Sequence, residues 1–398
     1  MLRLTYTTAL AAVLVLSASQ APAQSQRSTG PVATYWVTAR TSAGLPVGGA
    51  DFDPMAMMSG GGVQKSLRLQ LQSGRTVASP NADHEPPAGL NTGLLPLVTP
   101  GGQTAAPPSE FAPPTRGESG RVRMLIYHGC GEATGPGQPL VIEISSDDPG
   151  SGASQMASMM EAVQLTPETA PSPGAGRTYG EWPNDRSSQA IPASGSLVGE
   201  HLVRGNYTPD ISFRLGADQD FMEPIRLTGV ADGGPLGWNP VGGAHGYFAM
   251  TMGGNEAGDM VVWTSSEVPV SFGQIPDILS PTDVERLVRQ GVVLPASTTR
   301  CPIPRAVQTA APESMLRVIA FGGEANFSHP PRPANERETW NIEYAVKVRY
   351  TSVVSTILGM DMSEFADDGR RETPDSRQPP PNPADVLRGA LGRIIRPR

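Results

Sequence analysis

Glycine and proline constrain this chain more than any other feature, because 45 glycines and 41 prolines together make up 86 of its 398 residues. Both are unfavourable inside helices, glycine through its backbone entropy and proline through its ring and its missing N–H. An all-helical fold is therefore excluded. Hydrophobic residues reach only 38% and charged residues 17%, which suits neither a membrane bundle nor a highly charged disordered chain. The sequence predicts a mostly β protein with long irregular connections.

The N-terminus has the three parts of an export signal. Arg3 is followed by an apolar run over residues 9–16 and then by small residues that end at Ala23, which is the pattern of a signal-peptidase site. We expect residues 1–23 to be a signal peptide that is cleaved after Ala23. The mature protein is then expected in the periplasm of a Gram-negative envelope or outside the cell.

The net charge limits the partners. It is −8 for the whole chain and −9 without residues 1–23, which carry one arginine and no acid. Nucleic acid is disfavoured because phosphate binding needs a concentrated positive surface. The expected partner is an envelope protein or a glycan. Lysine occurs only at Lys65 and Lys347, a bias that a high-GC genome explains without any function.

Strand-like runs lie on both sides of a stretch at residues 146–195 that is rich in Ser, Gly, Pro and Ala. We interpret this stretch as a linker with one helical turn around residues 156–163. It would separate two β-sandwich-like domains, an N-terminal one at residues 31–145 and a C-terminal one at residues 196–365. The first combines at least four strands with long Gly/Pro-rich loops. The second has about seven closely spaced strands, which favours a sandwich.

One short helix is expected in the second domain. Ser280 can cap its N-terminus, Pro281 takes the first helical position, and Gly291 ends the run. Residues 366–398 are expected to form a disordered, Pro-rich tail that ends in an amphipathic helix. Because this helix carries arginines beside its apolar positions, it could dock on the protein, bind a partner, or make weak contact with a membrane surface.

Residues 236–247 read Leu-Gly-Trp-Asn-Pro-Val-Gly-Gly-Ala-His-Gly-Tyr. This segment resembles the early strands of fibronectin type III and related immunoglobulin-like modules, in which a core Trp is followed by a turn and an aromatic residue opens the next strand. Trp238 and Tyr247 take these two places. The resemblance implies a β-sandwich used for adhesion, scaffolding or ligand binding. Residues 24–190 resemble no known family.

The chain has two cysteines, Cys130 and Cys301. In an oxidising compartment such a pair tends to form a disulfide. Its loop of about 170 residues would stabilise the fold by roughly 5 kcal/mol in the chain-entropy model. The alternative is one buried and one surface thiol.

The motifs of common enzymes are absent from the sequence, including Gly-x-Ser-x-Gly, Ser-x-x-Lys and His-Glu-x-x-His. Potential metal ligands of hydrolases occur at His84, in a Pro-rich loop, and at His128 and Glu132, at the end of an expected strand. A metal-dependent hydrolase that uses the loops around these residues is one alternative function. Ordinary hydrogen bonds in turns explain the same histidines equally simply.

Methionine is clustered in two segments that are flanked by Gly and Ser. Thioethers are soft ligands that select Cu(I), so a periplasmic Cu(I)-binding protein is a second alternative. Methionines that fill gaps between domains would give the same pattern. The candidate copper ligands are Met55, Met57, Met58, Met156, Met159 and Met160.

The leading interpretation is an exported, non-enzymatic protein without a cofactor, which acts as a binding or scaffolding module at the envelope. Three structural features distinguish it from the alternatives. Converging His, Asp and Glu side chains would favour the hydrolase. Methionines that meet in space would favour copper, and an apolar groove or an exposed sheet edge would favour a binding module.

Overall fold

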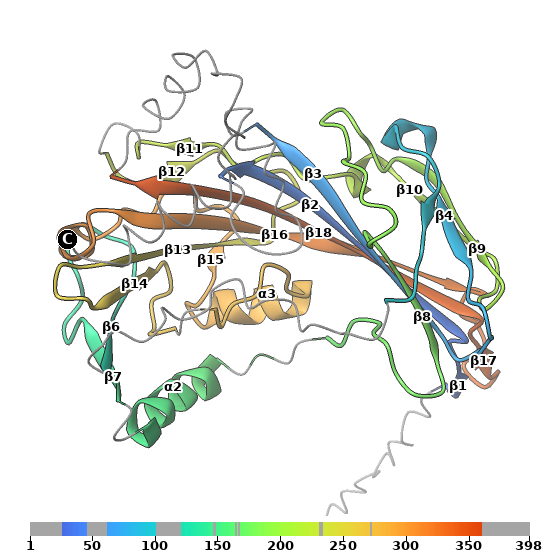
Figure 1. Cartoon of the computed structure of the whole chain (residues 1–398), viewed down its shortest axis with the longest axis horizontal. Helices are drawn as coiled ribbons and strands as arrows, with labels where there is room; N and C mark the ends of the chain where they lie inside the picture. The colour runs from blue at the N-terminus through green and yellow to red at the C-terminus, as the bar shows by residue number, and fades with distance from the viewer. Residues whose placement is uncertain are drawn as a thin grey trace, which may run out of the picture.

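The computed structural model is mostly β, as the sequence predicts, and it is organised around one long, twisted sheet (Figure 1). The residues that the structure describes are 26–45, 62–100, 121–145, 149–163, 165, 168–230, 234–270 and 273–359. The expected signal peptide, the tail at residues 366–398 and Met55, Met57 and Met58 lie outside them. Among the helices of these residues, none is long and apolar enough to cross a bilayer.

The large sheet has ten strands. Nine of them lie in the order β7-β6-β14-β13-β16-β18-β2-β3-β8, and the short β15 pairs with β13. The pairs β6/β14 and β18/β2 are parallel, and the other pairs are antiparallel. The strands are β2 (Ala33–Gly44), β3 (Gln64–Ser73), β6 (Arg121–His128), β7 (Leu140–Ser145), β8 (Thr178–Trp182), β13 (Gly246–Gly254), β14 (Met260–Thr264), β15 (Leu294–Pro295), β16 (Ser314–His329) and β18 (Tyr344–Leu358).

Smaller elements cover this sheet. A four-stranded sheet in the order β10-β9-β4-β5 lies over one end of it (Figure 1). It consists of β4 (Ala82–Glu85), β5 (Leu95–Pro96), β9 (Gly199–Gly205) and β10 (Ile211–Leu215). Two short pairs are β1 (Ser28–Thr29) with β17 (Trp340–Asn341) and β11 (Leu227–Thr228) with β12 (Gly237–Trp238). The helices are α2 (Pro149–Val163), α3 (Pro281–Arg289) and α4 (Arg305–Ala310), with 3-10 turns at Ala88–Leu90 and Ala217–Gln219.

The prediction of two separate sandwiches is wrong. The N-terminal strand β2 pairs along twelve positions with the C-terminal strand β18, and β6 pairs with β14. Strands from both predicted domains therefore share one sheet. The predicted linker at residues 146–195 is also structured, because it contains α2 and the edge strand β8.

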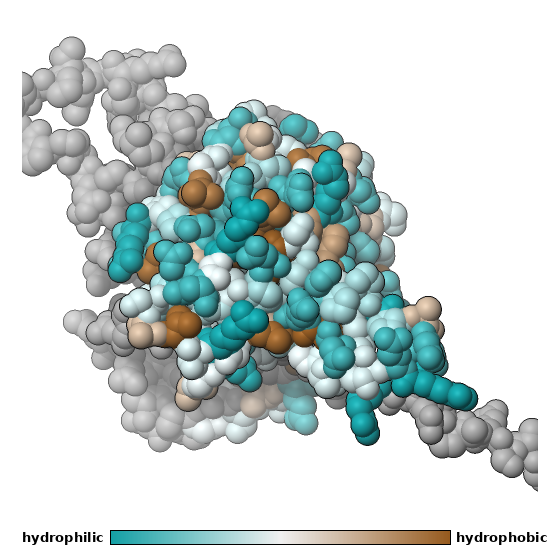
Figure 2. Space-filling model, turned by 90° about the vertical axis from the view of Figure 1, so that its right-hand side faces the viewer, coloured by the Kyte–Doolittle hydropathy of each residue, from teal (hydrophilic) through white to brown (hydrophobic). Residues whose placement is uncertain are grey.

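Alternation along the strands gives the large sheet two buried faces. Tyr35 and Val37 of β2 belong to the main core, which the four-stranded sheet, β12 and α4 close. Phe248 and Ile319 lie in a second core on the opposite side, where α3 packs. The outer surface beyond the four-stranded sheet mixes polar residues with scattered apolar ones and has no continuous apolar patch in the view of Figure 2.

Helix α3 confirms the predicted capping signal. The Ser280 hydroxyl accepts a hydrogen bond from the Asp283 backbone N–H at 3.1 Å, Pro281 begins the helix, and Gly291 adopts φ +70° after it. Such a left-handed residue after a helix favours glycine. Two helical predictions need correction. Residues 196–365 contain α4 as well as α3, and the single turn expected near residues 156–163 is the fifteen-residue helix α2.

The segment that resembles fibronectin type III modules lies at a junction of the main core. Trp238 on β12 packs against Tyr247 with ring centroids 5.5 Å apart. Tyr247 lies near the start of β13, where it pairs with Ala320 of β16. The Tyr247 hydroxyl accepts a hydrogen bond from the Val241 N–H. The core Trp, the turn and the following aromatic residue are therefore in contact, while membership in that family stays a prediction.

Candidate functional site

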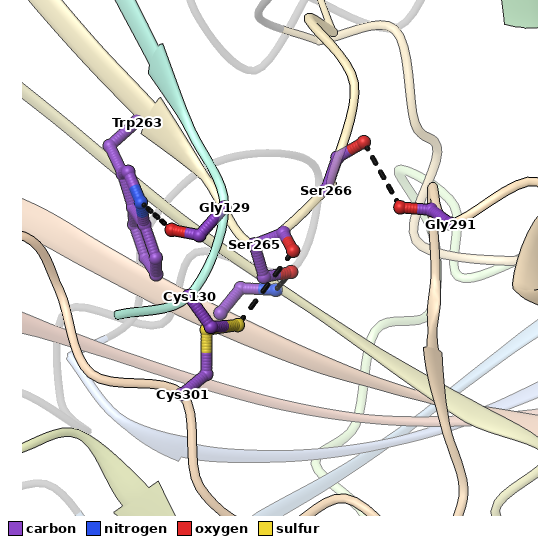
Figure 3. The surroundings of a disulfide bond; sticks show 8 residues. Gly129, Cys130, Trp263, Ser265, Ser266, Gly291 and Cys301 are labelled. Atoms are coloured by element: carbon purple, nitrogen blue, oxygen red, sulfur yellow. Dashed lines mark hydrogen bonds between the residues drawn. A yellow bond between two sulfur atoms is a disulfide. The ribbon is translucent and has the colours of Figure 1, made fainter. Parts of the chain in front are cut away.

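Cys130 and Cys301 form the predicted disulfide (Figure 3). The two residues are 171 positions apart in sequence. Cys130 follows β6, and Cys301 lies between β15 and α4 in a fully buried position. Beside them Trp263 donates its indole N–H to the Gly129 carbonyl at 2.8 Å. The bond ties the end of the large sheet to the segment that covers it, and it is consistent with an oxidising compartment.

His84 lies in the core rather than in an exposed loop. Its Nδ1 is 2.7 Å from the Tyr35 hydroxyl, and its Nε2 is 3.1 Å from Nδ1 of His201. The Nε2 of His201 is 2.7 Å from the Leu197 carbonyl oxygen. Because a carbonyl only accepts, the proton positions follow: His201 donates to Leu197, His84 donates to His201, and Tyr35 donates to His84. Every ring nitrogen is used when both histidines are neutral.

This polar chain connects the four-stranded sheet to the large sheet. Tyr35, His84 and His201 are each at most 1% exposed, and Phe213 stacks on His201 with ring centroids 4.8 Å apart. Burial lowers the pKa of His84 well below its ordinary value, and the neighbouring His201 lowers it further. Burial also lowers the pKa of His201. The pair is a structural element that favours neutral imidazoles.

The three residues of the hydrolase hypothesis are not brought together. His84 is occupied by Tyr35 and His201, as described above. His128 ends β6, where its backbone N–H donates to the Gln138 side chain. Glu132 forms an exposed ion pair with Arg305 at 3.3 Å. Within the described residues, no group of three or more His, Cys, Asp or Glu side chains could hold a metal ion.

Methionines, in contrast, do meet in space. Met124 on β6 and Met260 on β14 are direct neighbours across the parallel pair. Met252 on β13 lies opposite Val262, one pleat away from Met260 on the same face. Met156 and Met159 of α2 pack onto this face. These five residues, with Ile126, Ile142 and Val262 around them, are called the methionine cluster below; the methionines are Met124, Met156, Met159, Met252 and Met260.

The methionines of the cluster form two groups that differ in exposure. We call Met124 and Met159 the floor, because they are only 5% and 8% exposed. We call Met156, Met252 and Met260 the rim, because they are only partly buried. Three thioether side chains from three different elements therefore line the rim, and each is partly exposed to solvent.

Helix α2 owes its place to this cluster. Its sequence includes Gly150 and Gly152, and each glycine in a helix interior costs about 1 kcal/mol relative to alanine. Its serines bond back to helical carbonyls, as Ser158 does to Ser154 at 3.0 Å, which gives no tertiary contact. Met156, Met159 and Val163 recur at the spacing of one helical face and pack on the sheet. Packing therefore stabilises the helix more than its own propensity does.

Two hydrogen bonds from outside also hold α2. Gln274 donates to the Met159 carbonyl at 3.2 Å, and Arg286 of α3 donates to the Val163 carbonyl at 3.1 Å. Both contacts lie in the C-terminal half of the helix. The helix also packs on β7, the edge strand of the sheet (Figure 1).

Sequence reasoning found only part of this site. Met156 and Met159 are among the candidates predicted from the sequence. The side chain of the third candidate in this segment, Met160, lies outside the part of the chain that the structure describes. Met124, Met252 and Met260 were missed because each stands alone in a strand. One signal could have found them: in the predicted strands they alternate with residues of the opposite face. Met159, in the segment interpreted as a linker, is 8% exposed and belongs to a core cluster.

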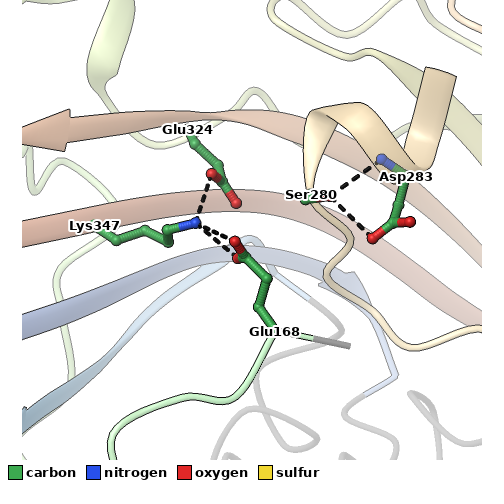
Figure 4. A network of polar contacts seen from close by, with 5 residues as sticks. All are labelled: Glu168, Ser280, Asp283, Glu324 and Lys347. Atoms are coloured by element: carbon green, nitrogen blue, oxygen red, sulfur yellow. Dashed lines mark hydrogen bonds and ion pairs between the residues drawn. The ribbon is translucent and has the colours of Figure 1, made fainter. Parts of the chain in front are cut away.

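A separate polar network crosses the sheet near its centre (Figure 4). Lys347 on β18 donates to Glu168 at 2.6 and 2.7 Å and to Glu324 on β16 at 3.0 Å. The Lys347 ammonium and the Arg349 guanidinium lie over the Trp36 ring, 5.4 and 4.3 Å from its centroid. The network pins the segment after α2 to the sheet and balances its own charges, which is a structural role.

No model of a known protein family matches the chain, and comparisons with curated proteins and with solved structures found no match either.

Proposed function

We propose that the protein is an exported, non-enzymatic binding protein whose ligand is the soft monovalent ion Cu(I), held by thioethers of the methionine cluster. The observation that carries this proposal is the convergence of five methionines from β6, β13, β14 and α2 on one face of the sheet. Thioethers prefer Cu(I) over hard cations. The proposal joins the leading interpretation of an envelope binding module with the copper alternative.

The rim provides the ligands. Met156, Met252 and Met260 are partly exposed, so the ion can bind without entering the apolar floor, where an isolated charge would be costly. Met156 sits on a helix whose packing is its main support, so α2 can shift to complete the coordination. Methionine also adapts to new positions because its side chain is unbranched and flexible.

The test is an anaerobic Cu(I) titration of the mature protein in competition with bicinchoninate. We expect one Cu(I) per chain and an affinity at least tenfold lower after Met156→Leu, Met252→Leu and Met260→Leu are combined. Met→Leu nearly conserves volume and costs less than about 1.5 kcal/mol per site. Met222→Leu is the matched control, because Met222 is 7% exposed in the main core, away from the cluster.

A second variant set addresses the other methionine run. Met55→Leu, Met57→Leu and Met58→Leu together should leave the affinity unchanged. Loss of binding in this set, with binding retained in the rim variant, would assign the ion to residues 55–58 and contradict the proposal. Absence of any competition by the unmodified protein at micromolar free Cu(I) would remove the proposal altogether.

The scaffolding function is a second candidate, and edge strand β7 favours it. Leu140 and Val141 are 36% and 37% exposed on the last strand of the sheet, and such edges accept an added strand from a partner polypeptide. A photo-reactive residue at position 141 should then cross-link to an envelope protein. The same residue at position 268, where Val268 is 38% exposed, should not; equal adducts from both sites would contradict this role.

A further inference from the structure

The methionines of the cluster differ sharply in their access to solvent. Met124 and Met159 are buried on its floor, while Met156, Met252 and Met260 are partly exposed on its rim. Oxidation of methionine to its sulfoxide depends on this access, because the oxidant must reach the sulfur lone pair. The rim therefore presents three reactive thioethers directly above an apolar floor.

We propose that Met156, Met252 and Met260 form an oxidation site for small two-electron oxidants such as hypochlorous acid, and that their conversion to sulfoxides releases α2 from the sheet. In each step a thioether sulfur gains an oxygen and is oxidised by two electrons. The chlorine of hypochlorous acid is reduced to chloride, and one proton is released to solvent. The balance is R–S–CH3 plus HOCl to R–S(O)–CH3 plus H⁺ and Cl⁻.

Release follows from the surroundings of the rim. A sulfoxide is polar and strongly accepts hydrogen bonds, whereas the side chains packed around these sulfurs include Ile126, Ile142 and Val262, which donate none. The exposed side of each rim methionine admits the oxidant, while its buried side packs in the apolar cluster. A polar sulfoxide packs less favourably there than a thioether, and it gains more contact with water when α2 moves away from the sheet.

Helix α2 is the element that gives way, because the other elements of the cluster are held more firmly. Strand β6 is hydrogen-bonded on both sides by β7 and β14, and the Cys130 disulfide follows it directly. Strand β14 lies between β6 and β13. Helix α2 has no ladder and depends on its methionines and on the bonds from Gln274 and Arg286.

This inference is independent of copper, and its test uses the metal-free mature protein. The protein is treated with one to three equivalents of hypochlorous acid at pH 7, and peptides are mapped by mass spectrometry. We expect Met156, Met252 and Met260 to be oxidised before Met124, Met159 and the core residue Met222. Simultaneous oxidation of Met222 would contradict the proposed selectivity.

The consequence is read by hydrogen exchange. Amides of residues 150–163 should lose their protection at least tenfold in the oxidised protein, while those of β13 and β14 keep theirs. The intrinsic tryptophan fluorescence, to which the buried Trp263 contributes, should stay unchanged if the core is intact. In the combined Met156→Leu, Met252→Leu and Met260→Leu variant, the same treatment should leave α2 protected.

Two results would overturn the proposal. One is a protein with oxidised rim methionines in which α2 keeps its protection. The other is an equal loss of protection in the leucine variant, because oxidation elsewhere would then be responsible. Neither result bears on Cu(I) binding, which is measured separately on the unoxidised protein.

Discussion

The Nε2 of His84 lies 3.1 Å from the Nδ1 of His201, deep between the four-stranded sheet and the large sheet. The two residues are 117 positions apart in sequence, so this contact forms only when the two layers close. Both rings are neutral in the hydrogen-bonded chain that runs from Tyr35 to the Leu197 carbonyl. Protonation of either histidine in acid would therefore disrupt the hydrogen bonds that connect the four-stranded sheet to the large sheet.

Stability should fall as the pH falls below about 6.5. The pKa of His84 and that of His201 are both lowered in the folded protein by burial, so the unfolded chain takes up protons first. Each histidine then removes up to about 1.4 kcal/mol of unfolding free energy per pH unit, until its folded pKa is reached. Urea unfolding at pH 7.5, 6.5 and 5.5 measures this. A constant free energy across this range would show that the pair is not buried as described.

Tyr35→Phe should destabilise the fold by about 1–3 kcal/mol, because the buried Nδ1 of His84 then loses its hydrogen-bond donor. Tyr127→Phe is the matched control. Tyr127 is 6% exposed, and within the described residues its hydroxyl forms no hydrogen bond. Chemical denaturation of the two variants gives the comparison, and equal losses would contradict the assigned proton positions.

Lys347→Met should cost about 3 kcal/mol, the lower end of the range for breaking a buried ion pair. Glu324, whose side chain is 9% exposed, would keep its charge without its nearest cation, although Arg349 nearby softens the loss. Lys65→Met is the control. Lys65 donates to the Gly195 carbonyl and lies over Phe221, and among the residues that the structure describes it forms no ion pair with an acid. A thermal melt in which Lys65→Met is the more damaging change would refute the assigned role of the network.

Removal of the disulfide by Cys130→Ser together with Cys301→Ser should lower the unfolding free energy by up to about 5 kcal/mol, because it frees a loop of 171 residues in the unfolded chain. The effect on Cu(I) affinity should be small, because the ligands are thioethers. Equilibrium denaturation and the bicinchoninate competition report the two quantities. A large drop in Cu(I) affinity would instead point to the cysteines as ligands.

Local signals in the sequence predicted local structure correctly. The Ser280 cap, Pro281 and Gly291 correctly indicate α3. The disulfide follows from the number of cysteines and from the expectation of an oxidising compartment. These features depend on neighbours in sequence, whose physical preferences can be read directly.

The remaining features depend on contacts that no local pattern encodes. Tyr344 pairs with Ala33 across more than 300 residues. This pairing places the N-terminal and C-terminal segments, which the composition suggests are separate domains, in one sheet. Only one turn of helix α2 is predicted, because its glycines and serines indicate a linker, whereas tertiary packing of Met156 and Met159 stabilises the longer helix. Met124, Met252 and Met260 became part of a site only once their strands were placed side by side.

The affinity for Cu(I) should be nearly independent of pH. Thioethers bind no proton in water, unlike imidazole or thiolate ligands, whose affinity falls in acid. We expect less than a twofold change in the dissociation constant between pH 7.0 and pH 5.5, measured under conditions in which the protein stays folded. A tenfold weakening in acid would indicate histidine or cysteine ligands.

The central claim is that the rim of the methionine cluster binds the ion, and methyl NMR tests it most directly. Protein labelled with ¹³C at the methionine methyl groups is titrated with one equivalent of Cu(I), or of Ag(I) as a redox-stable substitute. The methyl signals of Met156, Met252 and Met260 should shift together and reach saturation at one equivalent, while that of Met222 should stay in place. Saturating shifts confined to other methionines, with these three unchanged, would contradict it.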